Sequence, residues 1–201
     1  MANSIAGEGK IRAVALDFDG VVTRLEVDWK AAIQQASRVA GREVKSLLAF
    51  YESFHSTPLF QLVSREMEKL ELKALEKAKP MPFLKEFLEK ASSSNVEVFL
   101  VSMQSTAVVD CFLRRHDLSR FFKEVLTRDA FPSKKAEVEH ILNCLRLKPE
   151  EVLLVDDLER NIVRCGELGI RCFHFKPQQD RDALKEMWLT LAKLVCGESC
   201  C

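Results

Sequence analysis

Short apolar runs alternate with longer amphipathic segments along most of this chain. The runs read as strands buried on both faces, because they lack the polar alternation of a half-exposed strand. They occupy residues 11–17, 96–102, 151–157 and 170–175, with a weaker run at 124–127. The segments between them repeat apolar residues at helical spacing, as at 83–91, 138–145 and 162–168. This alternation predicts an α/β fold with a doubly wound parallel sheet.

The connection between the first two predicted strands is much longer than a crossover helix requires. About 70 residues separate Thr23 from Val96. Capping and stop signals divide this stretch into helices, which are predicted from Asp28 to Gly41, over 43–54 and from Thr57 towards Pro80. We therefore predict a helical domain at 24–80, inserted after the first strand of an α/β core that comprises residues 1–23 and 81–201.

Two carboxylates end the first predicted strand. Asp17 and Asp19 are separated by one residue, and alternate residues of a strand point to the same side. Ligands of open parallel sheets bind beyond the carboxyl ends of the strands, where these acids fall. Neighbouring carboxylates repel each other unless a cation neutralises them, and oxygen ligands favour Mg²⁺. Gly20 follows directly and permits a sharp turn with close backbone approach.

Polar residues also accompany the other predicted strands. Ser102 closes the second strand, and Asp156 and Asp157 close the fourth. Lys134 and Lys135 open the helix that precedes the fourth strand. A metal, a lysine and a serine together suit a phosphate group, because the cations balance its charge and the hydroxyl donates a hydrogen bond. An aspartate can attack phosphorus and form an aspartyl-phosphate, which divides hydrolysis into two easier steps.

Four of these segments resemble, in order, the motifs of the haloacid dehalogenase superfamily. The segments are LDFDGVVT (16–23), VFLVS (98–102), PSKKAEVEHIL (132–142) and VLLVDDLERNI (152–162). The resemblance extends over residues 11–175 and implies a Rossmann-like core with a small helical cap at 24–80, as in phosphoglycolate-phosphatase-like members.

The resemblance also implies a role for each motif residue. Asp17 would be the nucleophile, and Asp19 the general acid that protonates the leaving oxygen and then activates water. Ser102, Gly20 and one of Lys134 or Lys135 would hold the phosphoryl group, since the spacing does not choose between the lysines. The implied Mg²⁺ ligands are Asp17, the backbone carbonyl of Asp19, and Asp157, with Asp156 assisting. Asn161 stands where many members carry a second acid, and here it could orient a ligand or a water molecule.

The leading prediction is a Mg²⁺-dependent phosphatase that acts on a small phosphorylated metabolite. Three alternatives use the same fold: a phosphomutase, a 2-haloacid dehalogenase and a non-catalytic binding module. The acid at Asp19 and the pair Asp156-Asp157 argue against the dehalogenase, which needs neither a metal nor that acid. The sequence does not identify the natural substrate, and both a monomer and a homodimer are compatible with it.

Charge and composition narrow the classes of partner. Lys and Arg number 30, as do Asp and Glu, so no charge excess indicates nucleic acid or a membrane surface. The N-terminus MANSIAGEGK lacks the apolar core of a signal peptide, which predicts a cytoplasmic protein. All seven cysteines fall in the second half. We expect reduced thiols in the apolar segments, and a disulfide or incidental exposure among Cys196, Cys200 and Cys201.

Overall fold

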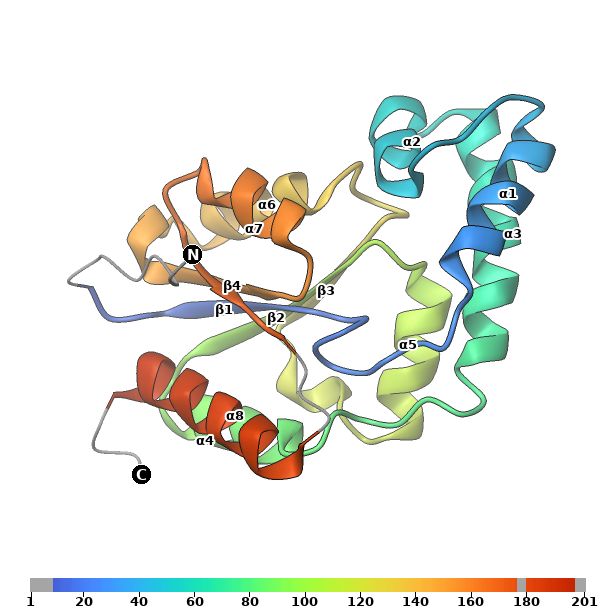
Figure 1. The fold of residues 1–201 in the computed structure, drawn as a ribbon. Helices are drawn as coiled ribbons and strands as arrows, with labels where there is room; N and C mark the ends of the chain where they lie inside the picture. The colour runs from blue at the N-terminus through green and yellow to red at the C-terminus, as the bar shows by residue number, and fades with distance from the viewer. Residues whose placement is uncertain (1–8, 177–179, 198–201) are drawn as a thin grey trace.

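Five parallel strands form a single sheet in the computed structural model, which describes residues 9–176 and 180–197 (Figure 1). The strands are β1 (Ala13–Asp17), β2 (Glu97–Ser102), β3 (Glu124–Thr127), β4 (Val152–Asp156) and β5 (Arg171–His174). Their order is β3-β2-β1-β4-β5. The predicted Rossmann-like α/β fold is therefore confirmed, and its central strand is the one that ends in Asp17.

Helices cover both faces of this sheet, which explains why its strands are apolar throughout. One face packs against α4 (Leu84–Ser93), α5 (Thr106–Arg115) and α8 (Arg181–Cys196). The other face packs against α6 (Lys134–Leu145) and α7 (Glu159–Gly166). Short 3₁₀ turns at Ser119–Phe121 and Pro149–Glu151 lead into β3 and β4.

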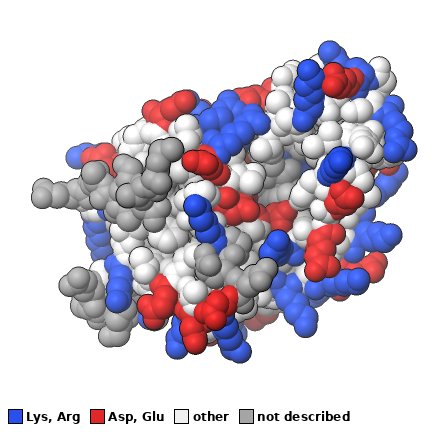
Figure 2. All heavy atoms as spheres, viewed as in Figure 1, with Lys and Arg blue, Asp and Glu red and all other residues white. Residues whose placement is uncertain are grey.

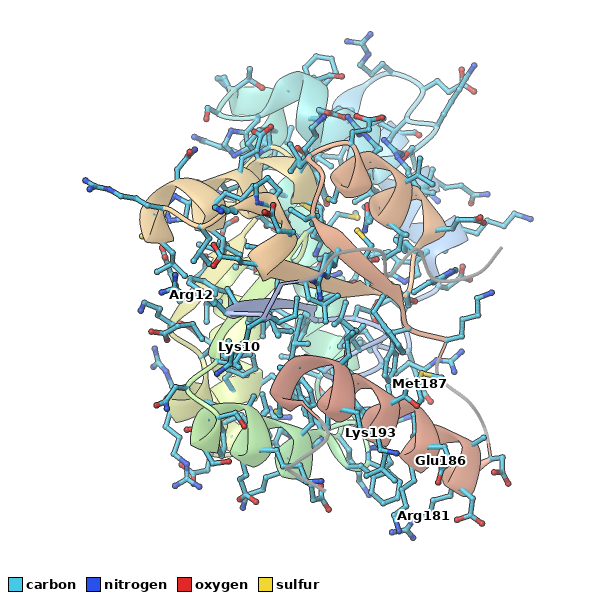
Figure 3. All side chains as sticks on the ribbon, turned by 90° about the vertical axis from the view of Figure 1, so that its left-hand side faces the viewer. Lys10, Arg12, Arg181, Glu186, Met187 and Lys193 are labelled. Atoms are coloured by element: carbon cyan, nitrogen blue, oxygen red, sulfur yellow. The ribbon has the colours of Figure 1, made fainter. Side chains whose placement is uncertain are left out.

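The side chains of β1 alternate between the two helix layers that cover the sheet. Val14 and Leu16 belong to the cluster with α4, α5 and α8, whereas Ala13 and Ala15 belong to the cluster with α6 and α7. On the outside of α8, the labelled side chains of Arg181, Glu186 and Lys193 point away from the sheet (Figure 3).

No described helix is long and apolar enough to cross a membrane.

The register of the sheet brings three strand ends together. Asp17 pairs with Val101 of β2, and Leu16 pairs with Val155 of β4. The last residues of β1 and β4 are therefore neighbours, as are the last residues of β1 and β2. Polar residues that are far apart in the sequence meet at this edge of the sheet.

Three further helices fill the long connection after β1, and we refer to residues 24–80 as the helical segment. They are α1 (Trp29–Ala40), α2 (Leu47–Phe54) and α3 (Pro58–Ala74), which pack around a further hydrophobic cluster that also includes Met103 from the loop after β2 (Figure 1). Their predicted caps are confirmed: Asp28 accepts a hydrogen bond from the Ala31 amide, and Thr57 accepts one from the Phe60 amide. That this segment is a separate domain stays a prediction.

Several helix ends differ from the predicted ones. Helix α2 begins after Ser46, not at 43, because the Ser46 side chain caps the Ala49 amide from an extended backbone. Helix α3 ends at Ala74, before Pro80, and the chain continues in turns that bond three residues apart. Helix α7 ends at Gly166, before the end of the predicted segment 162–168, because the chain again continues in turns that bond three residues apart. Apolar periodicity alone does not distinguish a last helical turn from such tighter turns.

The cysteines follow the expectation in part. The five that the structure describes are free thiols, and Cys165 is buried whereas Cys144 is exposed on the outer face of α6. Cys200 and Cys201 lie outside the described residues.

A buried arginine attaches the helical segment to the core. Arg128, which follows β3, is fully buried and donates to Glu71 Oε1 at 2.6 Å, to Ser64 and to the carbonyl of Met103. Its guanidinium also lies over the ring of Tyr51, 5.3 Å from the centroid. Burial raises the pKa of Glu71 above its ordinary value, although Arg128 opposes the shift. We call these contacts the Arg128 network.

A second attachment lies at the surface. Arg164 of α7 pairs with Glu52 of α2, and both side chains are 36% exposed. Because water screens such a pair, it contributes much less than a buried one. The Arg128 network is therefore the stronger of these two ionic attachments.

We expect Arg128→Met to lower the free energy of unfolding by about 3–5 kcal/mol, because Glu71 would be left buried without its partner. Urea denaturation followed by circular dichroism measures the loss. The matched control is Arg114→Met, which removes an exposed pair with Asp110 and should change the free energy by less than about 1 kcal/mol. Equal effects of the two substitutions would contradict a structural role for the Arg128 network.

Candidate active site

Three carboxylates meet where β1 and β4 end. Carboxylate oxygens of Asp17, Asp156 and Asp157 all lie within 4.8 Å of one another, and we call these residues the acid group. Asp17 and Asp156 are the last residues of β1 and β4, so the register of the sheet produces their proximity. Both are buried.

Lys134 supplies a positive charge to the acid group. It is the first residue of α6, directly after the capping Ser133, and its side chain is 4% exposed. Its Nζ donates to Asp17 Oδ1 and to the carbonyl of Val101, both at 2.7 Å, and lies 3.9 Å from Asp156. Although burial disfavours the ammonium, the facing carboxylates raise the pKa of Lys134 above its ordinary value. Lys134 therefore stays charged.

The neighbouring Lys135 lies outside this cluster. Its Nζ donates to Glu167 at 2.9 Å, towards the surface between α6 and α7. The periodicity of α6 contained a signal for this difference. Lys134 precedes the buried Val138 and Ile141 by four and seven residues, so it shares their face, whereas Lys135 does not. Of the two lysines, the structure brings Lys134 to the acid group and leaves Lys135 away from it.

Glu137 is a buried carboxylate that the sequence reasoning missed. It lies one turn after Lys134 on α6, and its Oε2 is 3.8 Å from the ammonium. Burial raises the pKa of Glu137 to about 8, although Lys134 opposes the shift. Its signal in the sequence was an acid three residues after the lysine, on the apolar face of the helix.

Asp156 is fixed by donors from the start of α7. The side-chain amide of Asn161 lies 3.1 and 3.0 Å from its two carboxylate oxygens, and the Leu158 amide donates at 2.8 Å. Burial and the nearby Asp17 raise the pKa of Asp156 well above its ordinary value. Asn161 thus orients Asp156, and its predicted contact with a ligand or a water molecule stays a prediction.

The acid group carries more negative charge than its surroundings balance. Among the described residues that face it, Lys134 is the cation in contact, and burial together with Asp17 raises the pKa of Asp157 to about 6. Oxygen ligands at this spacing and a surplus of negative charge suit a hard divalent cation such as Mg²⁺. Asp17, Asp156 and Asp157 could hold it.

Gly20 allows the acid group to form. Its φ is 95°, in the left-handed region, and a Cβ built on it would lie 2.4 Å from the carboxyl carbon of Asp157. Its amide donates to the carbonyl of Thr23 at 2.7 Å, which closes a turn directly after β1. The close approach expected at Gly20 is therefore present, and the approaching group is the Asp157 carboxylate.

Asp19 lines the same pocket as Asp17 and Asp157 but is not part of the acid group. Its Oδ1 accepts a hydrogen bond from the Leu25 amide at 2.7 Å, at the start of the helical segment. Burial raises its pKa to about 7, with further contributions from Asp17 and Asp157, although the Leu25 amide opposes the shift. The two aspartates of the first motif thus have separate surroundings.

Ser102 is fully buried at the end of β2, and its hydroxyl donates to Gln104 Oε1 at 2.6 Å. The backbone N–H of Gln104 in turn donates to Ser102 Oγ. Gln104 lines the pocket, whereas Ser102 does not. Gln104 is thus a second residue that the sequence reasoning missed, because nothing in its local pattern separates it from an ordinary polar loop residue.

A pocket lies between the acid group and the helical segment. Its cavity has a volume of about 900 Å³, and Asp17, Asp19, Lys134, Asp157 and Asn161 line its floor. Acidic side chains are visible in the middle of this face of the molecule, between the core and the helical segment (Figure 2). A ligand that enters the pocket therefore meets the acids and Lys134 at one end.

We expect Gly20→Ala to raise the dissociation constant for Mg²⁺ at least tenfold, because the new methyl group would displace the Asp157 carboxylate. Isothermal titration calorimetry measures the change. Gly41→Ala is the control, since Gly41 also has a positive φ but a Cβ there meets no atom within 4 Å. Both variants should lose about 1–2 kcal/mol of unfolding free energy to backbone strain. Equal Mg²⁺ affinities in the two variants would contradict the prediction.

Comparison with curated proteins finds similarity over part of the chain. A phosphoglycolate phosphatase from Vibrio parahaemolyticus serotype O3:K6 is 28% identical over 95 residues. The matched segment covers 46% of this chain and 42% of the Vibrio protein. The chain thus aligns with less than half the length of this relative.

Solved structures share the fold at low sequence identity. A predicted phosphoglycolate phosphatase from Haemophilus somnus 129pt has a TM-score of 0.60 at 16% identity, over 83% of this chain and 85% of that one. A dehalogenase has a TM-score of 0.62 at 16% identity, over 96% of this chain and 100% of that one. Since both reactions occur on the fold, the fold alone does not identify the reaction.

The family comparison covers most of the molecule. Residues 14–175 match the model of the haloacid dehalogenase-like hydrolases. This range contains the acid group, Asp19, Lys134 and the whole helical segment. The chain belongs to the haloacid dehalogenase-like hydrolase family.

Proposed function

We propose that this protein is a Mg²⁺-dependent phosphatase that hydrolyses a small phosphomonoester through an aspartyl-phosphate on Asp17. The observation that carries the proposal is the position of Asp17, which lies on the pocket floor in contact with Lys134 and beside two further acids. The Vibrio phosphoglycolate phosphatase supports the same reaction class.

The proposed first step transfers the phosphoryl group to Asp17. A carboxylate oxygen of Asp17 forms a bond to phosphorus while the bond between phosphorus and the ester oxygen breaks. Lys134 and the Phe18 amide both donate to Asp17 Oδ1, which holds the carboxylate in one orientation. The Lys134 ammonium also balances charge on the phosphoryl oxygens. Mg²⁺, held by Asp17, Asp156 and Asp157, would offset more of that charge.

Asp19 would move the protons. Its carboxyl group donates a proton to the departing ester oxygen, and the resulting carboxylate then takes a proton from water. The oxygen of that water attacks phosphorus, and the bond between phosphorus and Asp17 breaks. The hydrogen bond from the Leu25 amide supports this role, because it holds the Asp19 carboxyl apart from the acid group.

The phosphate site would extend to Ser102 and the helical segment. Ser102 donates to Gln104, so it would have to turn its hydroxyl to reach a phosphoryl oxygen, or else act through Gln104. Residues 24–80 would serve as a cap that limits the entry of water during the reaction. The Arg128 network supports this arrangement, because it fixes α3 to the loops that follow β2 and β3.

We expect Asp17→Asn to lower kcat for p-nitrophenyl phosphate at least about 10³-fold, because an amide cannot replace the attacking carboxylate. Release of p-nitrophenol measures the rate. Wild-type activity should need added Mg²⁺ and stop with EDTA, and unchanged circular dichroism would show that the variant folds. Full activity of the Asp17→Asn variant would contradict the proposal, as would turnover of chloroacetate by the wild-type protein without metal.

The two adjacent lysines provide a matched pair of variants. Lys134→Met should lower kcat/KM about 10²–10³-fold, because it removes the cation beside Asp17. Lys135→Met should leave kcat/KM within about twofold, because Lys135 pairs with Glu167 at the surface. The same assay serves for both. If Lys135→Met were the inactive variant, the assignment of Lys134 to the phosphate site would be wrong.

A further inference from the structure

The cavity above the acid group is larger than a two-carbon substrate requires. Its volume of about 900 Å³ lies near the upper end of the range for small-molecule pockets. With a phosphate at Asp17 and Lys134, the two-carbon acid of phosphoglycolate would reach only the lower part of this space. The upper part calls for a larger organic group.

The wall that the helical segment contributes to the pocket carries an apolar surface alongside charged residues. The helical segment contributes the side chains of Leu25, Val27, Trp29, Ile33, Leu47 and Leu48. Leu158 lines the pocket from the core, although 44% of its surface is exposed. A ligand that covers this wall with apolar atoms gains free energy, because it releases water from both surfaces.

The charged residues on that wall offer little to a second anionic group. Arg24 and Lys45 line the pocket but are exposed, and Lys45 lies 3.8 Å from Glu43. Glu26 and Glu71 line the same pocket, and Glu71 pairs with the buried Arg128. Among the described residues of the wall, no buried cation is placed to bind a carboxylate such as that of phosphoglycolate.

We infer that the substrate is a phosphomonoester whose organic group is an aromatic or bulky apolar ring. The ring would lie against Trp29 and Leu158 while the phosphate lies at Asp17 and Lys134. This inference rests on the phosphatase activity proposed above and narrows its substrate class. An aromatic ring gains both burial and a directed contact with the indole of Trp29.

The test compares three phosphate esters by release of inorganic phosphate in the presence of Mg²⁺: ethyl phosphate, 2-phenylethyl phosphate and phosphoglycolate. The first two share a primary-alcohol leaving group, so they differ chiefly in the ring. We expect wild-type kcat/KM for 2-phenylethyl phosphate to exceed that for either of the others by at least about tenfold.

Two substitutions test whether Trp29 and Leu158 cause the preference for 2-phenylethyl phosphate. Trp29→Ala and Leu158→Ala should each lower kcat/KM for 2-phenylethyl phosphate about five- to tenfold and leave ethyl phosphate within about twofold. Trp29 also packs against the helical cluster, whereas the Leu158 side chain belongs to none of the described hydrophobic clusters. Leu158→Ala keeps the backbone amide that donates to Asp156, so it removes only the apolar side chain from the pocket. Leu62→Ala is the control, because Leu62 is 49% exposed on α3 and does not line the pocket.

Two results would overturn the substrate class. One is a wild-type enzyme that prefers phosphoglycolate or ethyl phosphate to 2-phenylethyl phosphate. The other is an equal loss of kcat/KM for ethyl phosphate and for 2-phenylethyl phosphate in the Trp29→Ala and Leu158→Ala variants. Either result leaves the phosphatase proposal standing, because esters are still hydrolysed. If neither these esters nor p-nitrophenyl phosphate are hydrolysed, the phosphatase proposal fails and this inference fails with it.

Discussion

The ion pair between Lys134 and Asp17 determines how the rest of the site is arranged. Lys134 also donates to the carbonyl of Val101, so one ammonium joins the start of α6 to the ends of β1 and β2. A buried ammonium without such partners would cost several kcal/mol. The same charge makes the crowding of Asp17, Asp156 and Asp157 tolerable, and the remaining negative charge is what makes the site suitable for a divalent cation.

Features that depend on local sequence were predictable. Apolar runs identified all five strands, because a strand covered on both faces has no polar side. Asp28 and Thr57 were recognised as helix starts because a cap acts within three residues. The acids at the ends of β1 and β4 could be expected to meet, since the carboxyl ends of parallel strands share one edge of a sheet.

Features that depend on distant contacts were not predictable from one sequence. Arg128 and Glu71 are 57 residues apart, and each alone resembles an ordinary surface charge. Gln104 gains its position from the hydroxyl of Ser102, which no periodicity reveals.

The choice between Lys134 and Lys135 could be made from the helical periodicity of α6, once Val138 and Ile141 define its buried face. The catalytic roles of these residues remain proposals.

The two ionic attachments of the helical segment differ in their access to water. The bond from Arg128 to Glu71 is buried, whereas the pair between Arg164 and Glu52 is exposed. Added salt weakens the attraction between exposed charges, over a Debye length of about 10 Å at 0.1 M, and affects buried charges much less. Rising ionic strength would therefore weaken the surface link between α2 and α7, whereas the buried contacts of Arg128 with α3 and with Tyr51 of α2 would change little.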